Sequence, residues 1–532
     1  MVSPRLLALL VAAAAVHAQA PFPDPAGVPG ARILAGGGSL PPAVRQRFVE
    51  LAGGPQSHIV LVPTAGAGAD DHDAQDRIAA SWRQEFPQAT FTVVHTRDRA
   101  VADSEEFTAP LRAASGLWFG GGVQKRIADA YLGTRFEREL LALCTRGGVV
   151  GGTSAGTAIQ TRTMIQEGRD PPIVSQGFDL VPGAVVDQHF SQRQRLPRLC
   201  AVLGDHPGLF GIGIDESTAV EVQGRRLRVL GDGSATLVLA AGAGRPQRTL
   251  VLRSDEPADL VTWQRAARNR AGPPFPAAPM ADPVVAHGAL VIVGGGRLPR
   301  AVVERFVALA GGKNGKVVIV PGAAPAGGHG ADPIERVLRD AGIGRVAIFD
   351  AYAPADVTAE RLALLADATA VWFGGGRQWR LCDAFDGTEA IAAFAAVLAR
   401  GGVIGGSSAG ATIQGEFLVR GNPLGNQQEW CDGYDRGFAF LPGCAVDQHF
   451  LVRDRSADLQ ALIAQLPQLI GLGIDEGTAA VVQGPVLEVL GDSKLAVFDV
   501  RRADAAQQAT PTPVLLEPGA RWDLVQGKRL ER

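Results

Sequence analysis

The chain has 532 residues, of which 46% are hydrophobic and 20% charged, and its 51 basic and 54 acidic residues give a net charge of −3. This length exceeds what one hydrophobic core usually supports, so we expect two or more domains. The even charge balance excludes a broad electrostatic surface for nucleic acid and argues against a polybasic membrane-binding surface. The 67 glycines follow no collagen period, and ample Val, Ile and Leu exclude disordered and fibrous classes, which indicates an α/β protein with many tight turns.

Residues 1–18 are typical of a secretory signal peptide. Arg5 precedes an apolar run from Leu6 to Val16, and Val16-His17-Ala18 resembles a cleavage site, with Gln19 as the mature start. A membrane anchor is the alternative, but it needs about 20 apolar residues, and this run is shorter. We therefore expect a secreted or periplasmic protein with no membrane contact after signal cleavage.

The five cysteines are too few for a disulfide scaffold, and an odd count leaves at least one unpaired. Cys144 and Cys200 lie in apolar helical contexts, where we expect free thiols. Cys431 and Cys444 flank a loop, and the sequence does not decide whether an exported protein bridges them. No Cys/His spacing is typical of a metal site.

Short apolar runs alternate with helical patterns along the chain. We expect buried strands over 58–62, 117–119, 316–320 and 370–373, and helices over 42–52 and 299–310. Unbroken apolar strands that alternate with helices favour a mostly parallel sheet covered on both faces. Ligands of such sheets bind at the carboxyl ends of the strands, where the glycine-rich segments of this chain fall and where backbone approaches a ligand closely.

An internal repeat dominates the organisation of the chain. ILAGGG at Ile33 returns as VIVGGG at Val291, GGTSAG as GGSSAG, and VDQHF at Val186 as VDQHF at Val446. A period near 258 residues is too long for a solenoid and indicates two whole domains. We therefore predict two tandem three-layer α/β/α domains, each with a doubly wound sheet, at residues 31–270 and 287–532. A Pro/Ala-rich linker at 271–286 joins them.

The repeated motifs contain the residue types of nucleophilic catalysis. G-x-S-x-G places Ser154 and Ser408 on sharp strand-to-helix turns, and the histidines that recur in both repeats are His189 and His449. Each histidine is followed 27 residues later by a recurring Asp-Glu pair, and spacing alone does not separate Asp215 and Asp475 from Glu216 and Glu476 as the orienting acid. The order Ser, His, acid disfavours the α/β-hydrolases, in which the acid precedes the histidine.

At these motifs the chain resembles the cyanophycinase and dipeptidase E family of serine peptidases, whose fold is like that of class I glutamine amidotransferases. The resemblance covers essentially the whole mature chain, twice. It rests on a glycine pair followed one residue later by Gln, the serine turn, D-Q-H-F-x-x-R-x-R-x-x-R, and an apolar run ending in Asp-Glu. The second repeat departs from the motif at Asp458, in place of the third arginine. Its histidine also comes 41 rather than 35 residues after the serine, with the extra residues around 422–430.

The resemblance implies a role for each matching residue. The triads are Ser154, His189 and Glu216, and Ser408, His449 and Glu476. Backbone N–H groups of Ala155, Gly122, Ala409 and Gly376 would hold the oxyanion. The substrate pockets would contain Gln124, Asp187, Gln188, Arg193, Arg195 and Arg198 in the first repeat, and Gln378, Asp447, Gln448, Arg453 and Arg455 in the second.

The same resemblance implies an exported serine exopeptidase that acts on cyanophycin, a poly-aspartate bearing arginines on its side-chain carboxyls. It would release β-aspartyl-arginine through an acyl-enzyme formed at the β-aspartyl carbonyl, with no metal and no cofactor. The alternatives are an exported aspartyl or isoaspartyl dipeptidase of the same family, and a binding module with only one active repeat. Because the family suggests dimers, the two repeats are expected to pair as an intramolecular pseudo-dimer related by a pseudo-twofold axis.

Overall fold

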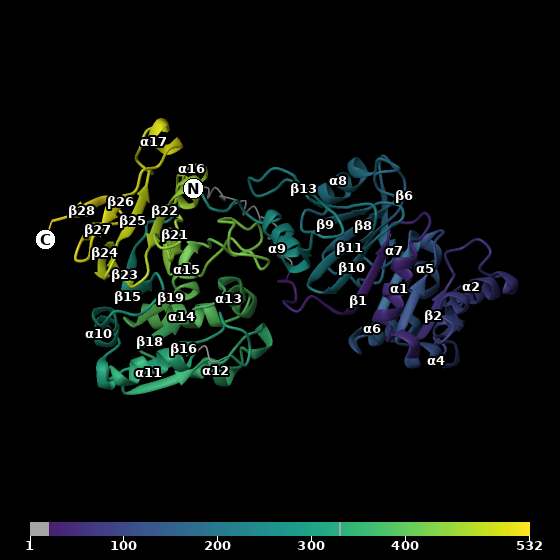
Figure 1. The fold of residues 1–532 in the computed structure, drawn as a ribbon, viewed down its shortest axis with the longest axis horizontal. Coiled ribbons are helices and arrows are strands. Elements are labelled where there is room, and N and C mark those ends of the chain that lie inside the picture. Colours follow the sequence, from purple (N-terminus) through teal and green to yellow (C-terminus); the bar gives the residue numbers. More distant parts are fainter. Residues whose placement is uncertain (1–20, 329–330, 532) are drawn as a thin grey trace, which may run out of the picture.

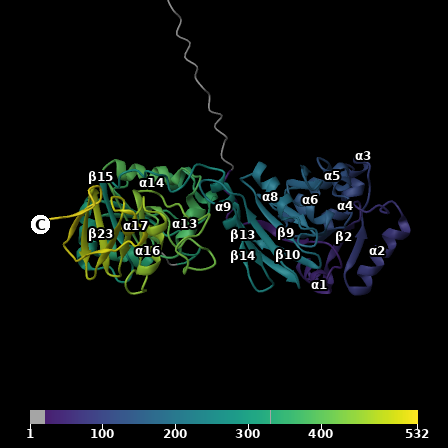
Figure 2. The same ribbon diagram turned by 90° about the horizontal axis from the view of Figure 1, so that it is seen from above.

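The computed structural model describes residues 21–328 and 331–531, so the predicted signal peptide at 1–18 lies outside the described residues. Figure 1 shows two lobes side by side, one for each repeat, and the view from above in Figure 2 shows the same separation. Each lobe contains a large mixed sheet with helices on both faces and a smaller sheet beside it.

The large sheet of the first lobe has a parallel half and an antiparallel half. In spatial order its strands are β14 (Ala258–Asp259), β11 (Arg226–Gly231), β10 (Thr218–Gly224), β1 (Val28–Ala35), β5 (Val149–Thr153), β4 (Gly116–Phe119), β2 (His58–Val62) and β3 (Thr90–Val93). The strands from β1 to β3 are parallel, and β10, β11 and β14 extend the sheet antiparallel. The predicted strands at 58–62 and 117–119 are confirmed as β2 and β4.

Alternate side chains of the parallel strands enter different cores, as expected of a sheet covered on both faces. Ile59 and Leu61 pack with Phe48 of α1 and Trp82 of α2, whereas Val60 packs on the opposite face. The helices of this lobe are α1 (Pro42–Leu51), α2 (His72–Glu85), α3 (Arg99–Ala102), α4 (Glu105–Ala113), α5 (Gln124–Tyr131), α6 (Arg135–Thr145), α7 (Ala155–Ala158), α8 (Leu196–Asp205) and α9 (Leu260–Arg270). The predicted three-layer α/β/α arrangement is thus confirmed for the parallel half.

A second, smaller sheet was not expected from the sequence. Its order is β13 (Arg248–Leu252), β12 (Ala235–Leu239), β9 (Phe210–Ile214) and β8 (Ala184–Gln188), and a separate hairpin joins β6 (Thr163–Glu167) to β7 (Ile173–Gln176). Ile212 and Leu237 of this sheet share a core with Val220 of β10, so the small sheet covers the antiparallel half of the large one. It places β8 and β9, which lead to His189 and Glu216, next to the serine turn.

The second lobe repeats this plan. Its large sheet is β17 (Arg345–Ile348), β16 (Lys316–Val320), β18 (Ala370–Phe373), β19 (Val403–Ser407), β15 (Val285–Val293), β23 (Thr478–Gly484), β24 (Val486–Gly491), β27 (Arg521–Asp523) and β28 (Lys528–Leu530). Its small sheet is β20 (Gly415–Phe417), β21 (Leu441–Gln448), β22 (Ile470–Ile474), β25 (Leu495–Asp499) and β26 (Val514–Leu516). Its helices are α10 (Arg300–Leu309), α11 (Asp332–Asp340), α12 (Ala359–Ala363), α13 (Gln378–Phe385), α14 (Ala390–Ala399), α15 (Ala409–Thr412), α16 (Ser456–Gln465) and α17 (Ala505–Ala509).

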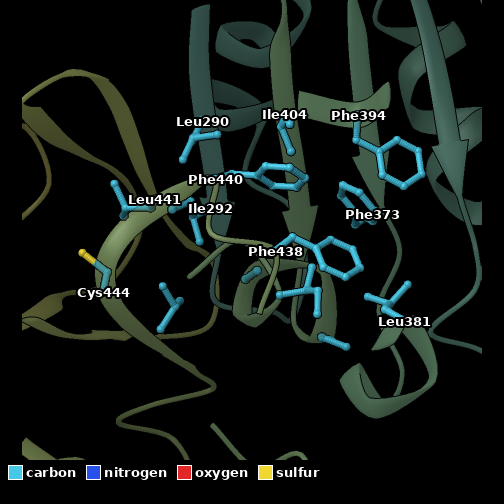
Figure 3. Packing of buried hydrophobic residues seen from close by; sticks show 14 of the residues in the cluster. Leu290, Ile292, Phe373, Leu381, Phe394, Ile404, Phe438, Phe440, Leu441 and Cys444 are labelled. Carbon is cyan, nitrogen blue, oxygen red and sulfur yellow. The ribbon is translucent and has the colours of Figure 1, made fainter. Parts of the chain in front are cut away.

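The segment between β20 and β21 differs most between the lobes, and it is anchored in the core. Figure 3 shows Phe438 and Phe440 of this segment against Phe373 of β18 and Ile404 of β19. The rings of Phe373 and Phe438 lie 5.8 Å apart, edge to face. The end of the segment is therefore fixed to the sheet that carries Ser408.

Residues 271–284 connect α9 to β15 and pack on the second lobe. The ring of Phe275 stacks on Phe417 with centroids 6.1 Å apart, and the guanidinium of Arg436 lies 4.1 Å from the centroid of Phe275. The five cysteines, including Cys431 and Cys444, are free thiols. Among the described residues, no helix has the length and apolar character needed to cross a membrane.

The two lobes contact each other through buried ion pairs. Arg270 of α9 lies 2.7 Å from Asp432, and Arg225 lies 2.7 Å from Asp383 of α13. Arg265 of α9 pairs with Asp386. These pairs join α9 of the first lobe to α13 and the loop at 431–436 of the second, and Figures 1 and 2 both show α9 at the junction.

The junction corrects the expected pseudo-twofold pairing. A pseudo-twofold contact would use the same elements from both lobes. The chain that follows β14 forms α9, whereas the chain that follows the corresponding β27 forms strand β28 instead of a helix. The lobes therefore join head to tail through unlike surfaces.

Candidate active site

Ser154 and Ser408 occupy matching strained turns. Ser154 lies between β5 and α7 with φ 51° and ψ −108°, and Ser408 lies between β19 and α15 with φ 56° and ψ −113°. A Cβ at Gly152 would lie 2.2 Å from the Gly156 carbonyl oxygen, and one at Gly156 would lie 2.3 Å from the Phe119 carbonyl oxygen. The flanking glycines of G-x-S-x-G are thus required by close backbone approach, and the turn presents the serine hydroxyl beyond the strand end.

The structure brings each serine to its predicted histidine and glutamate. Ser154 Oγ lies 2.9 Å from His189 Nε2, and His189 Nδ1 lies 2.6 Å from Glu216 Oε1. In the second lobe the matching distances are 2.9 Å for Ser408 to His449 and 2.5 Å for His449 to Glu476. With Nδ1 donating to the glutamate, Nε2 accepts the serine proton, which is the tautomer that a general base needs.

The hydrogen bonds show which acid of each Asp-Glu pair contacts the histidine, a choice that sequence spacing left open. Asp215 accepts from the Ser191 amide and the Ser234 hydroxyl, at 3.0 and 2.7 Å. Asp475 accepts from Leu451 and Val452 amides and from the Ser493 hydroxyl. The aspartates therefore support the loop that follows each histidine, and the glutamates orient the rings.

The first glycine motif serves the histidine rather than a ligand, which corrects the sequence-based interpretation. A Cβ at Gly37, where φ is +100°, would lie 2.3 Å from His189 Cε1, and one at Gly295, where φ is +120°, would lie 2.3 Å from His449 Cε1. The backbone after β1 and after β15 is thus pressed against the imidazole ring, and each ring is held between this backbone and its glutamate.

Both imidazoles are poised as neutral bases. Burial lowers the pKa of His189 below its ordinary value, and the charges of Arg193 and Arg195 act in the same direction. The Glu216 hydrogen bond opposes them. The pKa of His449 is lowered in the same way by burial, with Arg453 and Arg455 adding to it.

The predicted oxyanion donors come from two different segments. The Ala155 amide opens α7, and Gly122 follows β4 with φ +141°. A Cβ on Gly122 would lie 2.2 Å from the Ala65 carbonyl oxygen, and one on Gly376 would lie 2.3 Å from that of Ala323. Within the part of the chain that the structure describes, neither the Ala155 nor the Gly122 N–H donates to a protein acceptor, so both are available to a ligand.

A cavity of about 630 Å³ opens beside Ser154 and His189. It is lined by predicted residues Gln124, Gln188, Arg193, Arg195 and Arg198. Gln124 Nε2 donates to the Ile165 and Gln166 carbonyls at 2.8 and 2.7 Å, which fixes its side chain in the wall. Among the described residues, the buried Gln188 Oε1 has no hydrogen-bond partner, which leaves one unsatisfied acceptor in a residue of the cavity wall.

Asp187 is the one predicted pocket residue of the first lobe that does not line this cavity. It is fully buried, accepts from Arg198 Nε at 2.9 Å and lies 3.3 Å from Arg195 Nη1. Its role is to hold the two guanidinium groups in place, so that their remaining N–H groups face the cavity. The cavity therefore suits an anionic group.

A second, apolar cavity of about 310 Å³ reaches Gly121, which lies next to the serine turn. Its walls include Ile78, Trp82, Trp118 and Gly121, and a Cβ on Gly121 would lie 3.8 Å from Ser154 Cβ. Ser154 itself lines only the arginine-lined cavity.

Comparison with known proteins decides the family. The model of peptidase family S51 matches residues 33–230 and 290–490, one region in each lobe. The chain belongs to peptidase family S51. The second match shows that the internal repeat is a duplication of the S51 unit.

Curated S51 relatives match one unit at a time. The cyanophycinase of Synechococcus elongatus is 34% identical over 201 residues, 36% of this chain and 61% of the relative. The cyanophycinase of Geminocystis herdmanii is 30% identical over 204 residues, 37% of this chain and 74% of the relative. The chain therefore spans about 61% of the length of the Synechococcus relative.

Two solved structures are also similar to this S51 chain. A peptidase from an acI-B1 Actinobacterium has a TM-score of 0.36 and 22% identity, covering 44% of this chain and 98% of its own. A Listeria monocytogenes structure named for peptidase E has a TM-score of 0.31 and 16% identity, covering 39% and 100%.

The second S51 unit keeps part of the first pocket. Gln378 Nε2 donates to the Val419 and Arg420 carbonyls at 2.8 and 3.0 Å, as Gln124 does to its own pair. Asp447 is fully buried and lies 3.0 Å from Arg455 Nη1. Gln448 again has an unpartnered buried Oε1, and Arg453 is exposed.

Sequence reasoning missed the part of each S51 pocket contributed between the serine and the histidine. In the first unit the β6–β7 hairpin adds Gln166, Glu167 and Arg169 to the cavity wall, and Gln192 lines it as well. In the second unit Arg420 and Glu429 come from the corresponding segment. The signal was the difference in length between the repeats, which marks this segment as the place where they diverge.

Proposed function

We propose that this S51 protein is an exported serine exopeptidase that hydrolyses cyanophycin to β-aspartyl-arginine dipeptides. The observation that carries the proposal is the pair of hydrogen-bonded Ser–His–Glu triads, the first of which opens onto an arginine-lined cavity. Relatives named cyanophycinases, 30–34% identical over one unit, add support.

The reaction is acyl transfer to water. His189 Nε2 takes the Ser154 proton while Oγ attacks the substrate carbonyl, and the Ala155 and Gly122 N–H groups stabilise the oxyanion by about 3 kcal/mol each. The amide C–N bond breaks, and the leaving amine takes the proton from His189. Water then loses a proton to His189, attacks the ester and releases the carboxylic acid and the serine.

The bond cleaved follows from the product. β-Aspartyl-arginine retains the bond between the aspartyl side chain and arginine, so its release requires cleavage of a main-chain amide of poly-aspartate. Attack at the β-aspartyl carbonyl would instead free arginine. In the cleaved unit, the carboxylate of the attached arginine is the anionic group for Arg195 and Arg198.

Export is part of the proposal and rests on residues 1–18. The expected result is a mature amino terminus at Gln19 in protein recovered from outside the cytoplasm, measured by intact mass and terminal sequencing. An uncleaved chain retained in the cytoplasm would contradict export and leave the proposed chemistry standing.

The serines provide the test of the chemistry. Ser154→Ala and Ser408→Ala should each silence one site by roughly 10⁴-fold or more, and the double variant should release no β-aspartyl-arginine from purified cyanophycin. Products are identified by mass spectrometry, and circular dichroism confirms that the variants fold. Undiminished degradation by the double variant would overturn the triad assignment.

The apolar cavity beside Gly121 favours one second candidate, an aspartyl or isoaspartyl dipeptidase. Its Trp82 and Trp118 walls suit an apolar leaving residue better than a charged one. Turnover of aspartyl-leucine and isoaspartyl-leucine exceeding turnover of the polymer would favour this candidate.

A further inference from the structure

The two S51 units neutralise their buried aspartate with arginines from different elements. In the first unit, Arg198 of α8 binds Asp187, with Nε 2.9 Å from Oδ2. In the second, Asp458 stands at the position of Arg198, and Arg420 binds Asp447 through Nε and Nη2 at 3.1 Å. Arg420 corresponds to Gln166, because each supplies a carbonyl to the conserved pocket glutamine.

Because Arg420 takes the place of Arg198, the guanidinium group near the second site is bound to protein acceptors and is less available to a ligand. Arg198 binds Asp187 and the Gly168 carbonyl, and it still lines the cavity. Each nitrogen of Arg198 has a single residue as its acceptor, Asp187 for Nε and Nη2 and Gly168 for Nη1, which leaves further N–H groups for a ligand. Arg420 is 2% exposed, and its Nη1 and Nη2 each have at least two acceptors. Nη1 donates to the Asn426 and Gln427 carbonyls at 3.2 Å, and Nη2 lies 2.8 Å from Asp458.

The inserted segment also brings a carboxyl group of its own. Glu429 Oε2 lies 2.8 Å from Arg420 Nη2, the side chain is 10% exposed, and neither oxygen accepts a hydrogen bond of good geometry from the described residues. Burial and the Asp447 carboxylate raise the pKa of Glu429 well above its ordinary value. An acidic group of this chain thus lies against Arg420.

The charge balance and polarity of the second site change accordingly. In the first unit four guanidinium groups (Arg169, Arg193, Arg195, Arg198) accompany two carboxyl groups, the buried Asp187 and, in the cavity wall, Glu167. Three guanidinium groups (Arg420, Arg453, Arg455) accompany three carboxyl groups (Asp447, Glu429, Asp458) in the second. At the rim, Val452 is 61% exposed where Gln192 lines the first cavity.

We infer that the second S51 unit hydrolyses aspartyl substrates whose pocket-facing group is uncharged, whereas the first requires a carboxylate there. Repulsion from Asp458, together with the loss of free guanidinium N–H groups on Arg420, disfavours the acidic ligand in the second unit. This inference rests on the proposed peptidase activity and assigns its two sites different substrates.

Two probes that differ only in one carboxylate test the inference. Each is an aspartyl α-p-nitroanilide, with arginine on its side-chain carboxyl in one and argininamide in the other. The Ser408→Ala protein, with only the first site, should prefer the arginine probe in kcat/KM by about tenfold or more. The Ser154→Ala protein should show no such preference or the reverse.

Reciprocal variants identify the residues responsible. Gln166→Arg/Arg198→Asp in the Ser408→Ala protein should abolish the carboxylate preference, and Arg420→Gln/Asp458→Arg in the Ser154→Ala protein should create one. Asp458→Asn in the Ser154→Ala protein is the milder variant: it removes one negative charge beside Arg420 and should raise kcat/KM for the arginine probe. Fluorophosphonate labelling of the remaining serine confirms that each variant is folded.

The outcomes separate the inference from the proposed function. An equal carboxylate preference in the two single-serine proteins overturns the inference. So does absence of turnover in the Ser154→Ala protein when Ser408 still reacts with the fluorophosphonate. If the Ser408→Ala protein hydrolyses neither probe, the proposed function fails for the first site, and the probe ratio of the second site still decides the inference.

Discussion

The imidazole of His189 is fixed by different contacts on each side. Glu216 binds Nδ1, Ser154 binds Nε2, and the Gly37 backbone lies against the ring. Burial and two nearby arginines keep the ring neutral, which a general base requires. The same arginines line the cavity, so a carboxylate bound there would partly offset their effect on the histidine.

The charge effect gives a prediction about pH. The pKa of His189 lies below its ordinary value of 6.5. In the Ser408→Ala protein, the midpoint of the acid limb, over which kcat/KM declines toward acid pH, should therefore lie below pH 6.5. Arg193→Ala removes a positive charge, so the pKa should rise and the limb should move up by roughly 0.2–0.5 pH unit. Higher salt should move it the same way.

Arg300, whose side chain is 91% exposed on the second lobe, supplies the control for this measurement. Arg300→Ala should leave the limb in place. A limb that stays fixed or moves down in Arg193→Ala would show that this arginine does not act on the imidazole.

At the scale of elements, the turns at the carboxyl ends of β1, β5 and β8 assemble the first triad. Parallel pairing of β1 with β5 brings Gly37 close to the serine turn. The small sheet aligns β8 with β9, so that His189 and Glu216 emerge side by side. The triad thus depends on two sheets meeting at one edge.

The turn after β1 provides a test of this assembly. Gly37→Ala should lower kcat of the first site by about a hundredfold, because a Cβ 2.3 Å from His189 Cε1 must displace the ring. Gly53→Ala is the matched control, since Gly53 has φ +112° with nothing within 4 Å. Both variants should lose about 1 kcal/mol of stability, but Gly53→Ala should keep its activity. Equal activity in the two would refute the contact.

Elements and triad were predictable to different degrees. Unbroken runs of apolar residues predicted β2, β4, β16 and β18, because a strand that is covered on both faces has apolar side chains at every position. The run at 210–214 is just as apolar, but nothing local says that β9 joins a second sheet. The repeats identified serine, histidine and the acid pair, whereas the choice of glutamate needed contacts.

The buried ion pairs could not be predicted from the sequence, and the reason is physical. Arg420 reaches Asp447 across 27 positions, and Arg270 reaches Asp432 across 162. Such pairs depend on which surfaces fold together, and one arginine resembles another in the sequence. In the sequence, the second unit therefore shows only the loss of the arginine that corresponds to Arg198. In the structure, Arg420 takes its place and still neutralises the buried aspartate.

At the scale of the whole molecule, the junction couples the two lobes through ion pairs and through Val261 of α9, which packs in the core of the second lobe. Asp432 is 9% exposed in its side chain and lies 2.5 Å from Arg245 and 2.7 Å from Arg270 of the first lobe. Both arginines are almost fully buried; Asp432 is the carboxylate partner of Arg270, and Arg245 is shared between Asp432 and Asp435. The second lobe thus supplies the counter-charge that lets the first lobe bury these cations.

This dependence predicts how the molecule unfolds. Asp432→Ala should lower the free energy of unfolding by about 3–5 kcal/mol, because it leaves two buried guanidinium groups short of a partner. Asp367→Ala removes the partner of Lys316 and Arg345, where the carboxylate is 55% exposed and solvent screens the pairs, so it should shift the transition much less. In calorimetry the wild type should give one transition, and Asp432→Ala should give two as the lobes separate. If Asp432→Ala and Asp367→Ala shift the transition equally and neither splits it, the ion pairs at the junction do not couple the lobes.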